Sequence, residues 1–296
     1  MRCSIQGCRS VRAASAVIRH LRAEPFAAVG GTIYAVILVM AVFAPALAPY
    51  DPRALLRQGH RIARYLPISA EHWLGTTSGG QDVLSQLIYG ARAALEVGLT
   101  AAIAVVAIGT LLGLLAGYLG GWVDKVVTRV ADIALGLPFL PFMLVLASLT
   151  TPGTRVVIVT VALLLWPNTA RVIRAQVLSL RERAWVEAAR VTGCSTGRIM
   201  FVHVLPQVLP LAALYGSVAI GWAILAEAAA SFLGFGDPDT ISWGVMLQDA
   251  YANQALGRGA WNWFTPPGAA IVLMVLAGFL ISRGSEKLLF PKLADA

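Results

Sequence analysis

The sequence predicts an all-α membrane protein with six transmembrane helices and both termini in the cytoplasm. Hydrophobic residues make up 58% of the 296-residue chain, and only 13% of its residues are charged. A soluble domain carries about a quarter charged residues, so this composition is typical of a chain that crosses the bilayer several times. Six apolar segments and an uneven distribution of basic residues complete the prediction.

The N-terminal segment, residues 1–25, is predicted to lie in the cytoplasm and is rich in arginine. Its apolar residues recur at helical spacing, which favours an amphipathic helix on the membrane surface. An unstructured cytoplasmic tail explains the same residues equally well. The apolar run that follows is too long for the core of a signal peptide, so it is interpreted as an uncleaved first span.

Each of six apolar segments is close to the ~20 residues that cross the hydrocarbon core as a helix. Prolines interrupt the third segment at Pro138 and Pro141 and the fourth at Pro167. Such prolines are tolerated where neighbouring helices cover the freed carbonyls, which predicts a packed bundle. The segments lie within a transmembrane domain, residues 26–283, that is followed by a cytoplasmic tail, residues 284–296. They cover residues 26–49, 93–118, 131–150, 155–174, 207–233 and 265–282.

The orientation follows from the positive-inside rule. With both termini inside, 16 of the 23 Lys and Arg residues lie in cytoplasmic segments. The loop 50–92 runs against the rule, because it carries five arginines and must lie outside. The total still favours cytoplasmic termini.

Small and aromatic residues add two packing predictions. Gly109, Gly113 and Gly117 are four residues apart in the second span, and such a ridge lets two helices approach closely. Packing within the chain is favoured over a contact between subunits. Five tryptophans near the predicted span ends are interpreted as an interfacial aromatic belt, namely Trp73, Trp122, Trp243, Trp261 and Trp263.

A polar loop from Ser179 to Pro206 separates the fourth and fifth spans. Ser179 followed by Glu182 is a capping box, which predicts that a short helix begins there. Gly193 suits the end of that helix, and Ser195 can cap a second short helix. Pro206 suits the first turn of the next span. The loop is therefore predicted to be a helix-turn-helix on the cytoplasmic side.

Three acidic residues lie within predicted spans, and one of them, Glu96 near the outer end of the second span, is interpreted as an interfacial residue. Glu227 lies in the fifth span, where a carboxylate must face the bundle interior, a partner or water. A role in the pathway or its gate and a buried structural hydrogen bond are both open. Asp132, at the inner end of the third span, is expected to pair with Arg129 or to cap its helix.

Several functional classes find no support. The chain has no G-x-x-x-x-G-K-[ST] phosphate loop and no H-E-x-x-H zinc motif. One G-x-S-x-G match, at residues 193–197, follows a predicted helix where a nucleophile elbow needs a strand. Cys3, Cys8 and Cys194 lack metal-binding spacing, and the net charge of +8 is not gathered on a soluble face that could bind nucleic acid. We predict no catalytic residue, no metal and no cofactor in this chain.

The polar loop contains a spaced motif: E-A-A, three residues, Gly, eleven residues, then Leu-Pro. It falls on Glu187, Ala188, Ala189, Gly193, Leu205 and Pro206. This pattern resembles the EAA loop of ATP-binding-cassette (ABC) importer permeases. In that family the loop docks on a cytoplasmic ATPase subunit.

Three further stretches resemble the C-type permeases of oligopeptide and dipeptide importers. They are His72–Arg92, Leu225–Gly236 and the Pro267-Gly268 pair that opens the last span. The extreme C-terminus departs from the family pattern. The resemblance implies the type I importer permease fold for residues 25–293.

The resemblance also implies a function and a set of partners. The chain would form half of the translocation pathway for dipeptides or oligopeptides, as a multi-pass protein of the bacterial inner (plasma) membrane. Its partners would be a B-type permease, two cytoplasmic ATPase subunits that bind ATP and Mg²⁺, and an extracytoplasmic binding protein. Import of nickel or another small solute by the same fold is the main alternative. An autonomous ion-coupled carrier is a second alternative, although the chain shows neither an inverted repeat nor the intramembrane charge usual in carriers.

Overall fold

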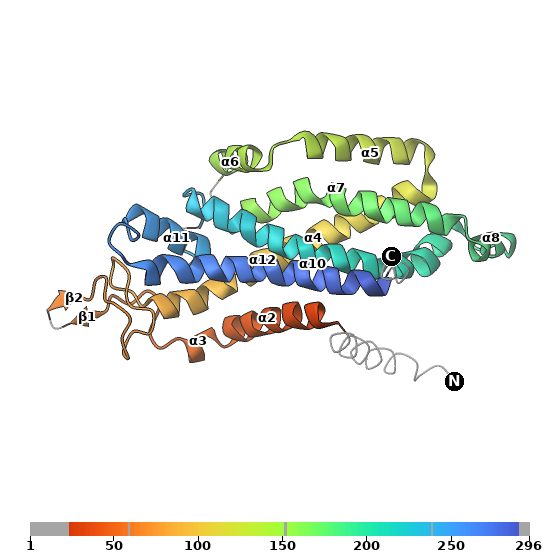
Figure 1. The fold of residues 1–296 in the computed structure, drawn as a ribbon. Helices are drawn as coiled ribbons and strands as arrows, with labels where there is room; N and C mark the ends of the chain where they lie inside the picture. Colours follow the sequence, from red (N-terminus) through yellow and green to blue (C-terminus); the bar gives the residue numbers. More distant parts are fainter. Residues whose placement is uncertain (1–23, 59, 151–152, 238, 290–296) are drawn as a thin grey trace.

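The structure, a computed structural model, describes residues 24–58, 60–150, 153–237 and 239–289. Long helices run roughly side by side in one bundle (Figure 1). Five of them are long and apolar enough to cross a membrane, and a sixth crossing is possible where two shorter helices form a bent pair. The five are α2 (Pro25–Val42), α4 (Val83–Leu119), α7 (Thr154–Arg181), α10 (Leu205–Phe232) and α12 (Trp261–Leu289).

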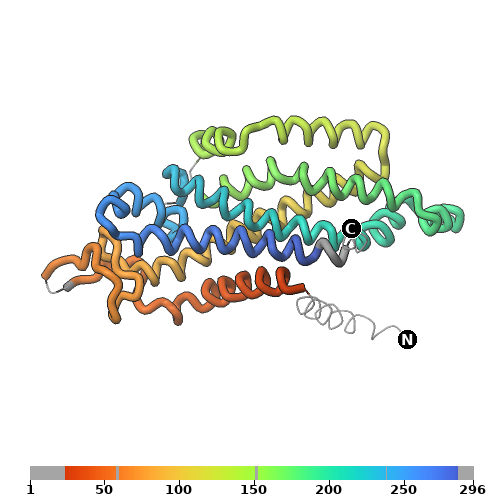
Figure 2. Tube along the Cα trace, in the orientation of Figure 1, coloured from red at the N-terminus to blue at the C-terminus, as the bar shows by residue number. Residues whose placement is uncertain are grey.

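The two ends of the bundle differ in structure. One end, called the hairpin end, carries α3 (Ala44–Leu47), α11 (Trp243–Ala252) and an antiparallel hairpin of strands β1 (Arg57–Gln58) and β2 (Arg61–Ile62). The other end, called the α8 end, carries the short helix α8 (Ala184–Val191). Figure 2 shows that the first described residues and the end of α12 both lie toward the α8 end. The hairpin is a small addition to the predicted all-α fold.

The predicted spans correspond to helices, and several of them differ in extent from the prediction. The second span begins ten residues before the predicted start, at Val83. Asp82 caps α4, since its carboxylate accepts the backbone N–H of Ser85 at 2.8 Å. Val83 is fully buried, so the first turn already packs in the bundle. At the other end of the chain, α12 continues beyond the predicted tail boundary to Leu289.

The third span is not straight. It consists of α5 (Gly121–Gly136) and α6 (Phe139–Leu149), which meet at an angle of 88°. Leu137 adopts an extended conformation, as residues before proline do. Pro141 lies in the first turn of α6, where its missing N–H costs no helical hydrogen bond. The region 119–131, which lies between two predicted spans, is mostly helix because α5 begins at Gly121.

Two ion pairs hold α5 against α7. Asp132 pairs with Arg171 at 2.7 Å, so its expected pairing with Arg129 is wrong. About two helical turns nearer the N-terminus of α5, both carboxylate oxygens of Asp124 accept hydrogen bonds from Arg174. The distance from Oδ2 to Nη2 is 2.7 Å. The pattern of residues on α5 alone could not identify partners on α7.

The glycine ridge of α4 packs within the chain, as predicted. A Cβ atom at Gly113 would lie 2.6 Å from the carbonyl oxygen of Ala170 on α7. Gly109 and Gly117 make equally close approaches to the carbonyls of Trp166 and Arg174. A residue with a Cβ atom at any of these three positions would push α4 and α7 apart.

Buried tryptophans organise the core at the hairpin end. Trp243 and Trp263 are each only 1% exposed, so their assignment to an interfacial belt is wrong. The indole of Trp243 donates to the carbonyl of Leu87 at 2.9 Å, which explains how it can be buried. The other three tryptophans of the predicted belt are exposed.

Of the basic N-terminal segment, residues 1–23 lie outside the described residues, and so do residues 290–296 of the C-terminal tail.

Candidate functional site

The segment between α7 and α10 begins later than predicted. Ser179 lies inside α7, which continues to Arg181, so the expected capping box is wrong. α8 begins at Ala184 after an extended Arg183. The apolar side of α7 explains the difference, because Val177 and Leu180 are buried and packing favours another helical turn over a local cap.

Gly193 ends α8 as predicted. Its φ of +81° lies in the left-handed region, which favours glycine. The backbone N–H of Gly193 donates to Arg190, and that of Cys194 donates to Ala189, each at 3.0 Å. These two bonds form a Schellman motif, which satisfies the carbonyls at the end of the helix.

The second helix of the segment is continuous with the next span. Ser195 caps it as predicted, accepting the backbone N–H of Arg198 at 3.4 Å. From Thr196 the chain remains helical to Phe232, through a π-helical turn at Ile199–Val204. The wide turn lets the N–H of Leu205 reach the carbonyl of Met200, just before Pro206, which has no N–H to donate. The prediction of a separate short helix is therefore wrong.

The α8–α9 segment, defined as residues 182–198, contains α8 and the short helix α9 (Thr196–Arg198). An apolar cluster anchors it on one side. We call this cluster the α8-end cluster. Val186 of α8 is fully buried in it, together with residues of α4, α7 and α10. Its buried members are Leu114, Tyr118, Ile173, Val177, Leu180, Val186, Ile199, Met200, Val204, Val208, Leu211 and Ala212.

The opposite side of the segment is open. Val191 is 82% exposed, so nothing in the described part of the chain covers this side of α8. Four of the six motif residues are exposed, three of them in this segment, and the other two contact the α8-end cluster. Exposed are Glu187, Ala188, Gly193 and Pro206, whereas Ala189 and Leu205 are half-buried.

Tyr118, at the end of α4, links the segment to the bundle, and the sequence patterns did not identify it. Arg190 of α8 lies over its ring at 5.9 Å. Arg181, at the end of α7, donates to its carbonyl oxygen at 3.3 Å. Arg190 also pairs with Glu187 at 3.3 Å, so the exposed glutamate is connected to α4 through one arginine.

Glu227 is buried near the hairpin end of α10. Its side chain accepts a hydrogen bond from the hydroxyl of Ser231, one turn further along α10, at 2.7 Å. The residue is 7% exposed. This contact gives Glu227 a structural partner within its own helix, and its role in the pathway or gate stays a prediction.

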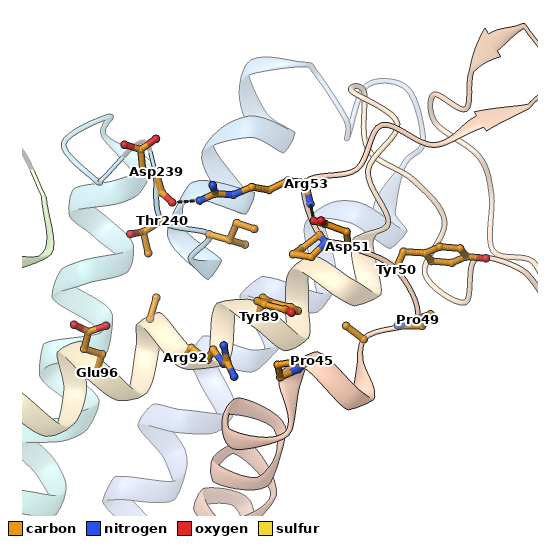
Figure 3. Close-up of a pocket in the computed structure, with 14 residues that line it drawn as sticks. Pro45, Pro49, Tyr50, Asp51, Arg53, Tyr89, Arg92, Glu96, Asp239 and Thr240 are labelled. Atoms are coloured by element: carbon orange, nitrogen blue, oxygen red, sulfur yellow. Dashed lines mark hydrogen bonds between the residues drawn. The ribbon is translucent and has the colours of Figure 1, made fainter.

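A polar pocket of about 630 Å³ lies at the hairpin end, and the sequence patterns did not predict it. Arg92 donates to the carbonyl of Ala41 at 2.7 Å and lies over the ring of Tyr89, so it fastens the end of α2 to α4. Figure 3 shows Arg53 donating to the backbone oxygen of Asp239 across the pocket. The pocket presents charges of both signs to any polar partner at this end. Its charged residues are Asp51, Arg53, Arg92, Glu96 and Asp239.

A metal centre would need several ligands close together. Within residues 24–289, apart from the gaps at 59, 151–152 and 238, no group of three His, Cys, Asp or Glu residues is placed to hold a metal ion.

Comparison with known proteins gives consistent matches along the chain. The family described as "Binding-protein-dependent transport system inner membrane component" matches residues 109–295. The "N-terminal TM domain of oligopeptide transport permease C" matches residues 14–67.

Individual relatives agree with these matches. A dipeptide transport system permease protein of Alkalihalophilus pseudofirmus is 34% identical, over 93% of this chain and 88% of its own. A putative peptide permease protein of Brucella suis is 37% identical, over 90% of this chain and 87% of its own. A probable D,D-dipeptide transport system permease protein of Escherichia coli is 34% identical, over 92% and 89%. The chain therefore belongs to the binding-protein-dependent transport system inner membrane components, the permease subunits of ABC importers.

Proposed function

We propose that this chain is the C-type permease subunit of an ATP-driven peptide importer and forms half of its translocation pathway. The relatives named for dipeptides and peptides support the substrate class, at 34–37% identity over most of the chain. The match of residues 14–67 to the oligopeptide permease C domain supports the subunit type. Nickel or another small solute is the alternative cargo for the same fold.

The family sets the chain in an assembly. A permease of this family is a non-catalytic, multi-pass protein of the bacterial inner membrane that works with an ATPase and a substrate-binding protein. We propose a more specific composition: one B-type permease, two ATPase subunits and one extracytoplasmic binding protein. ATP and Mg²⁺ would be held by the ATPase subunits, since this chain has no phosphate-binding loop.

One observation carries the coupling role. The α8–α9 segment has a face anchored in the α8-end cluster and an open face that carries Glu187 and Gly193. An ATPase that moves the open face would move α4, α7 and α10 with it, because all three contribute to that cluster. Such a rigid lever biases a two-state bundle toward one of its states.

The test uses the complex reconstituted in lipid with its neighbouring subunits and binding protein. We expect ATPase activity to rise with mixed di- to hexapeptides and not with nickel. Glu187→Lys reverses a charge on the open face, and Gly193→Pro cannot adopt the positive φ of this position. Both should lower peptide transport and the stimulated ATPase activity while the protein still inserts.

Glu71→Lys is the matched control, because it makes the same charge change in an exposed loop at the hairpin end. It should leave ATPase coupling unchanged. Normal transport by both Glu187→Lys and Gly193→Pro would contradict the coupling role. Stimulation by nickel alone would contradict the peptide substrate.

A further inference from the structure

A second cavity, of about 840 Å³, lies in the body of the bundle beside the bend between α5 and α6. Its walls come from α4, α7, α10 and the prolines of the bend. The volume is within the ~300–1,000 Å³ usual for small-molecule sites. It is separate from the hairpin-end pocket, with which it shares no residue.

The cavity wall is apolar except for three neutral side chains, Asn168, Thr169 and Tyr215. Asn168 lies at the middle of α7, and Tyr215 lies near the middle of the continuous helix 196–232. Within the described part of the chain, neither the Asn168 amide nor the Tyr215 hydroxyl makes a hydrogen bond. An amide left unpaired in hydrocarbon is costly, so a group at this depth is expected to meet water, a partner or a ligand.

The bend gives independent support for a wet cavity. Pro138 and Pro141 lie in its wall, and between α5 and α6 the helical hydrogen bonds are interrupted. Non-helical backbone at membrane depth is tolerated where it is buried in protein or lines a water-filled space. The break between α5 and α6 thus lies where water or substrate in a pathway could hydrogen-bond to the free backbone carbonyls of the bend.

The chemistry of the wall restricts what it can hold. No lining residue is charged, in contrast with the hairpin-end pocket. The ammonium and carboxylate at the two ends of a peptide would find no counter-charge from this chain, so the cavity wall would not hold a peptide by its ends. Peptide N–H and C=O groups are neutral, and they match an amide and a phenol that each donate and accept.

We propose that this cavity is the chain's share of the substrate pathway and that Asn168 and Tyr215 hydrogen-bond the backbone of the passing peptide. The proposal rests on the proposed function as a peptide importer. Every peptide carries the same backbone groups. Contact with the backbone therefore lets this part of the pathway accept peptides of different sequence.

The first experiment measures transport and ATPase activity of the reconstituted complex. Asn168→Leu and Tyr215→Phe each remove hydrogen-bonding capacity at nearly constant volume. Each should lower peptide transport about two- to tenfold, the range for one lost hydrogen bond. ATPase stimulation by the loaded binding protein should persist, so transport per ATP falls. Tyr34→Phe is the matched control: its hydroxyl donates to Ser217, outside this cavity, and transport should be unchanged.

The second experiment tests occupancy directly. In a complex whose native cysteines are replaced by serine, Asn168→Cys should react with a water-soluble thiol reagent, and peptide with binding protein should slow that reaction. Leu163→Cys is the control, because it is 47% exposed but lies about 140° around α7 and outside the cavity wall. A thiol in lipid stays protonated and should not react.

The outcomes separate this proposal from the proposed function. If wild-type complex transports peptide but Asn168→Cys is not protected and Asn168→Leu transports normally, the cavity is not on the pathway. If wild-type complex shows no response to any peptide, the importer function itself fails. Protection of Asn168→Cys by peptide together with reduced transport in Asn168→Leu supports the proposal.

Discussion

At the scale of single residues, Gly193 shows how one backbone angle holds the α8–α9 segment together. Its Schellman motif closes α8, and a Cβ at this position would meet nothing within 4 Å. Space therefore does not require glycine here, and only the positive φ does. This separates a conformational effect from a steric one.

We expect Gly193→Ala to destabilise the α8–α9 segment by about 1 kcal/mol, the usual cost of a left-handed conformation for a residue with a Cβ. Trypsin should cleave after Arg190 about fivefold faster as local opening increases. Gly197→Ala is the matched control, since its Cβ also meets nothing but its backbone is helical. Alanine there should leave cleavage unchanged or slow it. Equal cleavage of both variants would contradict the role of the positive φ.

The motif positions of this segment could be read from the sequence, and their contacts could not. Gly193 and Ser195 have the roles predicted, because a helix end and a cap depend on a few neighbouring residues. Tyr118 was missed, since its contacts with Arg181 and Arg190 join positions more than sixty residues apart. No local pattern carries such information.

At the scale of elements, two ion pairs and a small apolar cluster around Ala131, Trp166 and Ala170 join α5 to α7. The pairs differ in environment: the side chains of Arg174 and Asp124 are 35% and 23% exposed, whereas those of Arg171 and Asp132 are 53% and 47% exposed. Arg174 also binds both carboxylate oxygens. A better-shielded bidentate pair contributes more than an exposed one.

We therefore expect Arg174→Met to destabilise the bundle by about 1–3 kcal/mol, because it leaves Asp124 unpaired. Arg171→Met should cost under about 1 kcal/mol, as exposed pairs do. Thermal unfolding of the purified complex in detergent measures both. Adding Asp124→Asn to Arg174→Met should recover part of the loss by removing the unpaired charge. Equal losses for the two arginine variants would show that the shielding of the pair does not matter.

Helix positions followed from hydropathy, because length and apolar composition determine which segments cross a bilayer. The bend in the third span did not follow, although Pro138 and Pro141 marked the place. Proline shows where a helix weakens, and packing against α4 and α7 decides how far it turns. Trp243 was misassigned for a related reason: its burial depends on the carbonyl of Leu87, which lies 156 residues away in the sequence.

At the scale of the whole molecule, three chemistries are arranged along the bundle. The α8 end carries an anchored helix with an open face, the hairpin end carries a pocket with charges of both signs, and a neutral cavity lies between them. This order fits the proposed function: a polar surface at one end, a passage that does not trap charge, and the proposed lever for the ATPase at the other end. The proposal requires that the α8 end faces the cytoplasm.

The orientation of the bundle can be tested directly. The α8–α9 segment and the hairpin lie at opposite ends of the bundle, so they must lie on opposite sides of the membrane (Figure 1). The positive-inside rule places the α8 end in the cytoplasm, although the hairpin's own arginines oppose this choice. We therefore test the two ends with single cysteines, Arg61→Cys and Thr192→Cys, in a transport-active chain whose native cysteines are serine. Both positions are exposed. In cells whose outer membrane is permeabilised and whose inner membrane is intact, a membrane-impermeant maleimide should label Arg61→Cys at once. It should label Thr192→Cys only after the inner membrane is permeabilised. The reverse order would place the α8–α9 segment outside, where no ATPase could reach it, and the proposed lever mechanism would fail with it.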